Sequence, residues 1–256
     1  MKVNYHTHLG RCMHAVGTER EYVESAIEAG FDVLGISDHV AWPFPGGYVS
    51  RVRMPMREMD SYVQTVLDLK KEYRNDIKLL LGFETEYMPA MFWELMETVD
   101  QYPLDYMILG QHYFDAEGVG AYVGDPFSDI EALRLYVRQT LEGLDTGRFL
   151  YLAHPDLPNF RGDAEDYRTE MEHLCREVKK RDIPIEFNLL GFGERRWYPR
   201  GAFWEIVKEV GNRVIFGYDA HQPSFLARSY LRDQAAEYLH SLGIIPLETL
   251  GIENNL

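Results

Sequence analysis

Residues 56–87, MREMDSYVQTVLDLKKEYRNDIKLLLGFETEY, predict a helix that leads directly into a buried strand. In the first part, apolar side chains recur at steps of three and four residues, as the buried face of a helix requires: Met59, Tyr62, Val63, Val66 and Leu69. The second part contains the apolar run Lys78–Phe83, which has the length of a strand and is followed by the acidic residue Glu84. The stretch therefore predicts a helix followed by a strand, with an acidic side chain where the strand ends.

Short apolar runs and longer amphipathic runs alternate along the rest of the chain. The apolar runs predict strands at Val3–His6, Val33–Ser37, Lys78–Phe83, Tyr106–Gly110, Phe149–Ala153, Pro184–Phe187 and Val214–Gly217. The amphipathic runs predict helices at Glu19–Ala29, Met56–Tyr73, Ala90–Val99, Asp129–Leu144, Ala164–Arg181, Phe203–Val210 and Pro223–Leu242. This alternation predicts parallel βαβ units in a single α/β domain over residues 1–256, closed as a barrel or, alternatively, open as a doubly wound sheet.

Composition argues against several classes of function. The 256 residues carry a formal net charge of −15, which would repel phosphates, so a long nucleic acid partner is not expected. No basic region followed by an apolar run opens the chain, and its longest apolar stretches are strand-sized. We therefore expect no signal peptide, no membrane span and a cytoplasmic location. The two cysteines, Cys12 and Cys175, form no CxxC pair and are predicted to be reduced structural thiols.

Metal-ligand residue types fall at the carboxyl ends of the predicted strands, where both a barrel and an open sheet place function. They are seven of the nine histidines and two acidic residues: His6, His8, His14, His39, Glu84, His112, His154, Asp219 and His221. The other two histidines, His173 and His240, lie inside predicted helices. A single loop histidine is more often a surface or hydrogen-bonding residue than a ligand, but independent roles would not select the same end of nearly every strand. The joint placement therefore predicts a metal site.

The residue types also indicate which metals and which chemistry to expect. Neutral imidazole and carboxylate oxygen suit Zn²⁺, Fe²⁺ and Mn²⁺, and the sequence has no cysteine cluster for a closed structural zinc site. These candidates exceed what one ion can use, so we expect two or three ions bridged by a carboxylate. Ions about 3.5–4 Å apart are the usual arrangement for hydrolysing phosphate esters, because they activate water and neutralise charge on the phosphoryl oxygens.

Six short motifs, in this order, resemble the PHP family, which is named for polymerase and histidinol phosphatase domains. The motifs are HTH in Tyr5–Leu9, SDH in Ser37–His39, GFETEY in Gly82–Tyr87, GQH in Gly110–His112, AHPD in Ala153–Asp156 and YDAH in Tyr218–His221. HxH alone is a weak signal, but the ordered set is highly specific and covers nearly the whole chain. Residues 51–73, together with residues 77–87, resemble the histidinol-phosphatase branch in particular.

The resemblance implies a distorted (β/α)₇ barrel, similar to a TIM barrel, with a centre of three divalent metal ions (Zn, Mn or Fe). One ion would take His6, His8, Glu84 and Asp219. A second would share Glu84 and take His112 and His154. The third would take His14, His39 and His221. The resemblance also implies that Glu84, Asp219 and Asp38 are catalytic, with Asp38 supporting the ligands or handling a proton; the alternative for Asp38 is a cap of the loop after its strand.

The resemblance further implies that the protein is a hydrolase, a metal-dependent phosphatase. A hydroxide that bridges two metals would attack phosphorus in line, and the expected reaction converts L-histidinol phosphate and water to L-histidinol and phosphate, in histidine biosynthesis. One alternative is a PHP phosphoesterase or phosphodiesterase that acts on another small phosphorylated metabolite or nucleotide. An alternative from another class is a non-catalytic metal-binding regulatory module. The oligomeric state is open.

Three arginines are candidates for binding the phosphate of the substrate, because arginine matches its geometry with two parallel hydrogen bonds. Arg161 lies in the loop after the fifth predicted strand, and Arg195 and Arg196 lie in the loop after the sixth. We expect both loops to face the metal-binding end of the barrel. Of these, Arg161 and one of the other two are favoured; the alternative for each is an ordinary surface arginine.

Two further segments bear on the substrate. The loop 41–55 is rich in Trp, Phe, Pro and Gly and contains Arg51 and Arg53, so it could be a lid or an ordinary long loop that packs on the barrel. Leu189 and Leu190 stand where the histidinol-phosphatase branch commonly has small or hydroxyl residues. They predict a more apolar pocket and leave the identity of the alcohol open.

Overall fold

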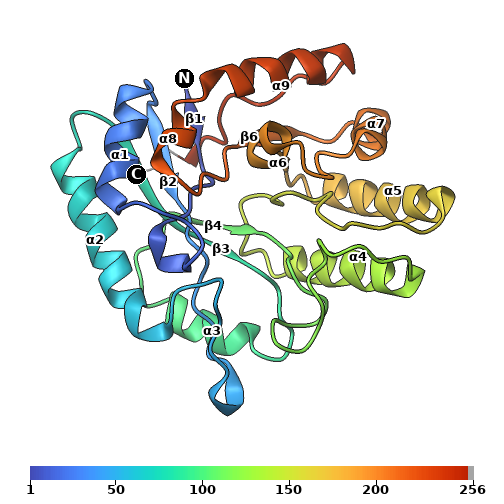
Figure 1. Ribbon diagram of the computed structural model, residues 1–256, viewed down its shortest axis with the longest axis horizontal. Helices are drawn as coiled ribbons and strands as arrows, with labels where there is room; N and C mark the ends of the chain where they lie inside the picture. Colours follow the sequence, from blue (N-terminus) through green and yellow to red (C-terminus); the bar gives the residue numbers. More distant parts are fainter. Residues whose placement is uncertain (253–256) are drawn as a thin grey trace.

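Short parallel strands curl around the centre of the molecule, and helices surround them (Figure 1). The computed structural model describes residues 1–252. Within that range the strands are β1 Val3–Asn4, β2 Val33–Ile36, β3 Lys78–Thr85, β4 Tyr106–Leu109, β5 Ile185–Asn188 and β6 Val214–Gly217. The α-helices are α1 Glu19–Glu28, α2 Met59–Glu72, α3 Phe92–Val99, α4 Ile130–Asp145, α5 Ala164–Lys180, α6 Leu189–Glu194, α7 Gly201–Val210, α8 Pro223–Leu226 and α9 Ser229–Ser241.

The strands form two parallel sheets, in the orders β1-β2-β3-β4 and β5-β6. The predicted strand Phe149–Ala153 lies between them but is reduced to one residue: Leu152 forms parallel bridges to Leu109 of β4 and to Ile185 of β5. Leu152 N donates to Pro184 O (3.0 Å). Because Pro184 has no N–H group, it cannot donate the next hydrogen bond of the ladder. The expectation of a full strand here was therefore wrong, although the segment does join the two sheets.

The seam between β6 and β1 is closed by one backbone bridge, in which His8 N donates to Ala220 O (3.0 Å), and by the side chain of Asn4. Thr7 forms an isolated parallel bridge to Ala220. Next to it, the Asn4 carboxamide oxygen accepts hydrogen bonds from the backbone N–H groups of Tyr218 (3.0 Å) and His6 (3.1 Å). The amide nitrogen of Asn4 donates to His6 O (2.9 Å). The resulting closure confirms the expected distorted (β/α)₇ barrel and excludes the open doubly wound sheet.

Two other sequence expectations need correction. The predicted last helix, Pro223–Leu242, is two helices, α8 and α9, because Arg228 between them has non-helical backbone angles (φ −81°, ψ 55°). The short helix α6 was not predicted, since its six residues follow β5 without a loop. Asn188 starts it, because its side chain accepts a hydrogen bond from Gly191 N at 2.8 Å.

Alternate residues of the strands build two separate cores. One set packs outward against the helices, as Leu79, Leu81 and Phe83 of β3 do. The other set fills the barrel: Val3, Tyr5, Val33, Leu80, Tyr106, Ile108, Tyr151, Ala153 and Ile215. Leu247 and Leu250 from the end of the chain pack against this inner set, and Leu247 N donates to Val214 O at 2.7 Å. The inner core therefore supports the strand ends from below.

The Tyr106 ring crosses the barrel interior and requires glycine on two neighbouring strands. A Cβ on Gly35 would lie 2.2 Å from the Tyr106 hydroxyl and 2.9 Å from Tyr5 Cα. A Cβ on Gly82 would lie 2.6 Å from the same ring. Tyr106 Oη donates to Tyr5 O (2.6 Å), so the ring cannot move aside without losing a buried hydrogen bond.

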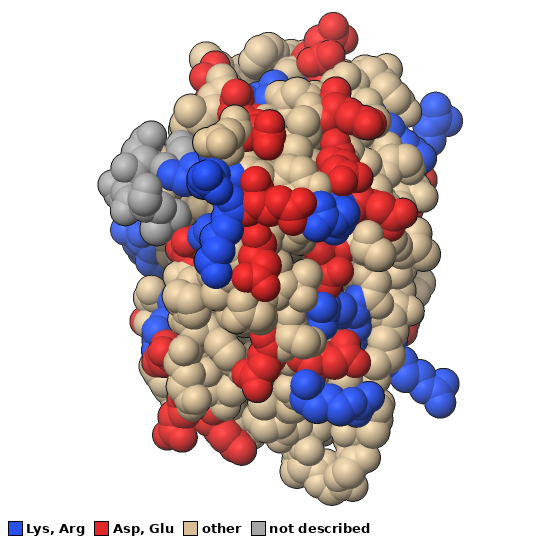
Figure 2. Space-filling view, turned by 90° about the vertical axis from the view of Figure 1, so that its left-hand side faces the viewer, with Lys and Arg blue, Asp and Glu red and all other residues tan. Residues whose placement is uncertain are grey.

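Acidic and basic side chains are interspersed on the face of the molecule shown in Figure 2, which is the left-hand side of Figure 1. On the exposed surface of α1, Arg20 donates to both carboxylate oxygens of Glu72 in α2 (2.6 and 2.7 Å). This face carries no broad basic surface for a polyanion. Among the described residues, none of the helices combines the length and the apolar character needed to cross a bilayer.

We predict that Gly35→Ala destabilises the barrel by about 1–3 kcal/mol, the usual cost of overpacking a core, because backbone and a hydrogen-bonded ring surround the new methyl group. The measurement is the free energy of unfolding in urea. Gly201→Ala is the matched control, since the nearest atom to its Cβ lies 3.8 Å away. A Gly35→Ala protein as stable as the wild type would contradict this packing.

Candidate metal centre

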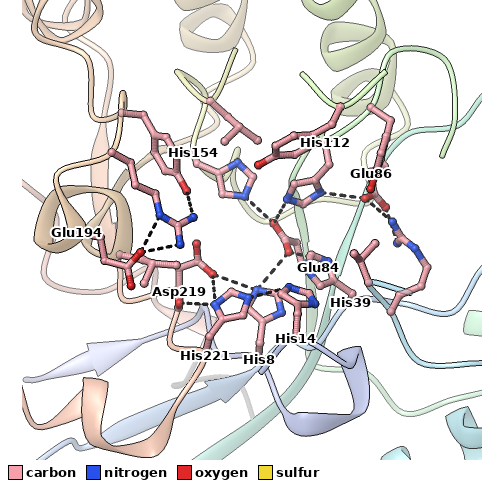
Figure 3. Close-up of a pocket in the computed structure, with 18 residues that line it drawn as sticks. His8, His14, His39, Glu84, Glu86, His112, His154, Glu194, Asp219 and His221 are labelled. Atoms are coloured by element: carbon pink, nitrogen blue, oxygen red, sulfur yellow. Dashed lines mark hydrogen bonds and ion pairs between the residues drawn. The ribbon is translucent and has the colours of Figure 1, made fainter. Parts of the chain in front are cut away.

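The carboxyl ends of the strands bring the nine predicted ligand residues together in space, and Figure 3 shows all of them except His6. Eight of them line a cavity of about 560 Å³: His8, His14, His39, Glu84, His112, His154, Asp219 and His221. The ninth, His6, is fully buried beneath it. The two histidines predicted to lie elsewhere, His173 and His240, are in α5 and α9. The structure therefore gathers the residues that the motif order singled out.

The Glu84 carboxylate lies at the middle of this cluster. Three imidazole nitrogens face its Oε1 atom: His154 Nε2 at 2.8 Å, and the Nε2 atoms of His6 and His112, each at 3.5 Å. Two more face its Oε2 atom, His39 Nδ1 at 3.0 Å and His8 Nε2 at 3.3 Å. These histidines come from the ends of four different strand segments, so the Glu84 carboxylate lies where those ends meet.

A second carboxylate, Asp219, faces the histidines of the first strand. Its Oδ1 atom lies 3.1 Å from His8 Nε2, 3.5 Å from His6 Nε2 and 3.3 Å from His221 Nδ1. The His6 and His8 Nε2 atoms are only 3.0 Å apart, as are those of His14 and His221. Nitrogen atoms this close cannot all be protonated, so the cluster favours a shared cation between them.

Several buried oxygen and nitrogen atoms of the cluster lack hydrogen bonds, and these atoms show whether the cluster fits a metal. Glu84 Oε2, Asp219 Oδ1 and His39 Nδ1 are buried, and although ring nitrogens lie close to the two oxygens, none of the three atoms has the geometry of a hydrogen bond to a described residue. Burying such atoms unpaired is costly, and metal coordination is one way to satisfy them. Candidate ligand atoms lie within 4.8 Å of one another in the groups His6–His8–Asp219, His6–Glu84–His154 and His14–His39–His221. The residues therefore fit divalent metal ions.

The charges of the cluster also favour a cation. Burial alone would raise the pKa of Glu84, but the facing histidines, His112 first, hold it well below its usual range. Burial and the positive charge of His8 lower the pKa of His221 to about 3 and also lower the pKa of His39. Burial alone would lower the pKa of His6, but the carboxylates that face it, Glu186 first, raise it to about 10, and the pKa of His8 is also raised. The cluster thus holds positive charge next to ionised carboxylates. A divalent metal ion, whose usual ligands are imidazole and carboxylate, would supply that charge in place of the protons.

A buried carboxylate behind the cluster orients one of its histidines, and none of the six motifs contains it. Glu186 of β5 lies 2.8 Å from His6 Nδ1, and Asn188 Nδ2 donates to Glu186 Oε1 (2.7 Å) and to Asp219 Oδ2 (3.0 Å). Such partners fix the tautomer of a metal-binding histidine. The signal in the sequence was a charged residue, Glu186, in the otherwise apolar run Pro184–Phe187.

Asp38 lies behind His8 and does not line the cavity. Its Oδ1 atom is 3.4 Å from His8 Nδ1 and accepts a hydrogen bond from His39 N at 2.9 Å. It therefore holds both the loop after β2 and the His8 ring. This placement combines the supporting role and the loop cap that the sequence left as alternatives.

His154 and Asp219 have left-handed backbones, with φ values of 26° and 51°. Residues other than glycine rarely adopt this region, and it costs about 1–3 kcal/mol. In both residues the strained backbone carries a side chain of the cluster. Strain of this kind concentrates at functional sites.

The three candidate phosphate-binding arginines have different placements. Arg196 lines the cavity, pairs with Glu194 (2.7 Å) and donates to the Tyr198 hydroxyl (3.2 Å). Arg161 and Arg195 are exposed and are not among the residues that line the cavity. The structure thus brings one of the three, Arg196, to the cluster.

Apolar and aromatic side chains form much of the rest of the cavity wall, beside the charged residues Glu86 and Arg53. It includes Leu157, Leu190, Tyr122 and Tyr198, together with Val52 and Arg53 from the 41–55 loop. Leu189 is buried in the outer core instead. Of the two residues that depart from the histidinol-phosphatase branch, only Leu190 therefore lies on the cavity.

Cys12 lies closer to the cluster than the sequence suggested. Its thiol donates to Leu9 O (3.1 Å), and its Sγ atom is 4.0 Å from His14 Nε2. The candidate ligand atoms of His8, Cys12 and His221 also form a compact group. Burial raises the pKa of the Cys12 thiol, which favours the protonated form and agrees with a structural role.

Comparison with known proteins places this cluster in a family. A family model described as "PHP domain" matches residues 4–189. The chain belongs to the PHP family. The match confirms the resemblance that the six motifs indicated, and it includes the residues from His6 to His154; Asp219 and His221 lie beyond it.

Individual relatives share the histidinol-phosphatase name. A Deinococcus radiodurans protein named "Probable histidinol-phosphatase" is 27% identical over 232 residues, which cover 85% of each chain. The "Histidinol-phosphatase" of Bacillus subtilis is 23% identical over 259 residues, covering 88% of this chain and 95% of the relative. The crystal structure of histidinol phosphate phosphatase from Lactococcus lactis, complexed with zinc, L-histidinol and phosphate, has a TM-score of 0.74. It shares 19% identity and covers 96% of this PHP chain and 95% of its own. This last similarity shows the shared fold.

The space for the Glu84 carboxylate depends on a glycine, which leads to a prediction. A Cβ on Gly110 would lie 1.9 Å from Glu84 Oε1. We predict that Gly110→Ala displaces the carboxylate and weakens the binding of Zn²⁺ or Mn²⁺ by at least about tenfold. The measurement is metal affinity by chelator competition, with the melting temperature recorded in parallel.

Gly201→Ala, far from the cluster, serves as the control for this experiment. Unchanged metal affinity in a folded Gly110→Ala protein would show that Glu84 is not at the centre of the metal site.

Proposed function

We propose that this protein is a metal-dependent phosphomonoesterase, and that its substrate is L-histidinol phosphate. The observation that carries the proposal is the position of Glu84, a buried carboxylate that is faced by five imidazole nitrogens and lines a cavity that Arg196 also lines. The names of the relatives supply the choice of substrate. Hydrolysis would convert the phosphomonoester and water into an alcohol and phosphate.

We further propose that three ions occupy the cluster. His6, His8, Glu84 and Asp219 would hold the first; Glu84, His112 and His154 the second; His14, His39 and His221 the third. The compact ligand groups formed by His6–His8–Asp219 and by His14–His39–His221 support the first and third sets. For the second, support comes from the short distances of His154 and His112 to Glu84 Oε1. When bound, such ions supply an activated water and positive charge for the phosphoryl oxygens.

The protein's own residues would orient the substrate. In this proposal Arg196 binds the phosphate, because it is the candidate arginine on the cavity and Glu194, its carboxylate partner among the described residues, is itself exposed. Leu157, Leu190 and Tyr198 would pack against the alcohol. Asp38 would act through His8, which it holds in place, rather than by touching the substrate.

The functional domain, in this proposal, extends past the matched residues 4–189. Asp219 and His221 after β6 complete the cluster, and the end of the described chain packs on the inner core through Leu247 and Leu250. The predicted domain, 1–256, ends in residues 253–256, which lie outside the described residues.

A first prediction follows for the reaction. His6→Ala and Glu84→Ala should each abolish phosphatase activity, because each removes a donor from the middle of the cluster. The measurement is phosphate release with Mn²⁺, Zn²⁺ or Fe²⁺ present, from L-histidinol phosphate and from a panel of phosphomonoesters and phosphodiesters.

The panel also decides between functions. A kcat/KM for L-histidinol phosphate no better than for generic esters would remove that substrate and leave the reaction class. Preference for a diester would favour a phosphodiesterase. Bound metal without turnover of any ester would favour a non-catalytic metal-binding module. Full activity in either variant would refute the proposed centre.

A second prediction separates the three arginines. Arg196→Ala should lower kcat/KM for the phosphomonoester by roughly ten- to a hundredfold, the value of a charge-assisted hydrogen bond of about 1.5–3 kcal/mol. Arg161→Ala and Arg195→Ala are matched controls, since both side chains are exposed away from the cavity, and each should change kcat/KM less than about twofold. A large loss in either control, with none for Arg196, would reverse the assignment.

A further inference from the structure

A fully buried arginine ties the 41–55 loop to the barrel. The Arg53 side chain is only 1% exposed. Its guanidinium donates to both carboxylate oxygens of Glu86 at 2.8 and 2.9 Å, and its Nε atom donates to Glu117 Oε2 at 2.6 Å. Glu86 and Glu117 are also buried. The charge of the arginine is therefore matched by two carboxylates from two other segments, an arrangement that fixes the loop in one position.

Additional contacts from the loop converge on the same two carboxylates. Trp42 Nε1 donates to Glu86 Oε2 (3.2 Å), and the Tyr48 hydroxyl donates to Glu117 Oε1 (3.1 Å). The ring of Tyr48 also packs on Gly118, where a Cβ would lie 2.9 Å from it. The beginning, the tip and the end of the loop are each held by the same network.

Glu86 links this network to the metal cluster. Its Oε1 atom, besides accepting from Arg53, lies 2.9 Å from His112 Nδ1, and a carboxylate can only accept in such a pair. The hydrogen of the His112 ring is thereby placed on Nδ1. The free Nε2 atom then points to Glu84 Oε1, 3.5 Å away. The orientation of one cluster histidine thus depends on the carboxylate that holds the loop (Figure 3).

We propose that Glu86 is a positioning residue that orients His112 toward the metal cluster, and that Arg53, held between Glu86 and Glu117, makes the 41–55 loop a fixed wall of the cavity. The inference rests on the metal-binding part of the proposed function. Val52 and Arg53 line the cavity, so the wall is in contact with whatever the cavity binds. The loop is therefore part of the site in the free protein rather than a lid that closes over it.

The two carboxylates around Arg53 allow the two halves of the proposal to be tested separately. Glu86→Gln keeps the shape but removes the charge next to His112, and it should weaken metal binding by roughly ten- to a hundredfold. Glu117→Gln leaves Glu86 in place and should leave metal affinity within about twofold. Instead it should speed tryptic cleavage after the exposed Arg51, because the loop is less firmly held. Glu94→Gln, an exposed carboxylate on α3, is the matched control for both.

The same substitution in a His112→Ala protein distinguishes a positioning role of Glu86 from a general effect on stability. If Glu86 acts through the ring of His112, Glu86→Gln should cause no further loss of metal affinity in a His112→Ala protein. An equal loss in both backgrounds, or unchanged affinity in Glu86→Gln itself, would overturn the positioning role. Cleavage after Arg51 in Glu117→Gln as slow as in the wild type would overturn the fixed wall. Metal affinity and proteolysis need no substrate, so both remain informative if the protein proves inactive on every phosphoester.

Discussion

The structure of the site depends on a buried carboxylate at the centre of a ring of imidazoles. Glu84 stands at the end of the longest strand, β3, and the histidines that face it come from the neighbouring strand ends. Gly110, the residue that follows β4, has no side chain and so leaves the space that the Glu84 carboxylate occupies. Because a buried carboxylate needs positive charge or hydrogen bonds close by, the loops around it are constrained in position and in residue type.

Support for this ring extends outward through further acidic side chains. Glu186 holds His6, Asp38 holds His8 and Glu86 holds His112, each from the side of the ring opposite the cluster. Each of these outer carboxylates therefore fixes the orientation of the histidine ring that it contacts. The acidic excess of the chain is therefore not only a surface property, since several of its carboxylates are buried around one cluster of candidate metal ligands.

The sequence predicted which candidate ligands meet in space, because they lie at strand ends, and strand ends are visible as the limits of apolar runs. It could not predict Leu152 as a single-residue strand, since the loss of the ladder depends on Pro184 of a neighbouring segment. It also did not separate Arg196 from Arg195, because which of two adjacent residues faces a cavity depends on the left-handed turn at Arg195 (φ 53°). In the sequence, buried partners such as Glu86 and Arg53 cannot be distinguished from ordinary charged surface residues.

The seam between the first and last strands has a consequence for the order of events in synthesis. His14 and His221 are 207 positions apart in the chain, yet their ring nitrogens are 3.0 Å apart. An ion held between them would cross-link the two ends of the barrel where the backbone ladder is thinnest, much as a disulfide closing a long loop would. A nascent chain that has not yet released residue 221 has no complete set of donors. In the proposed arrangement, binding of an ion between His14 and His221 would therefore have to follow the release of residue 221.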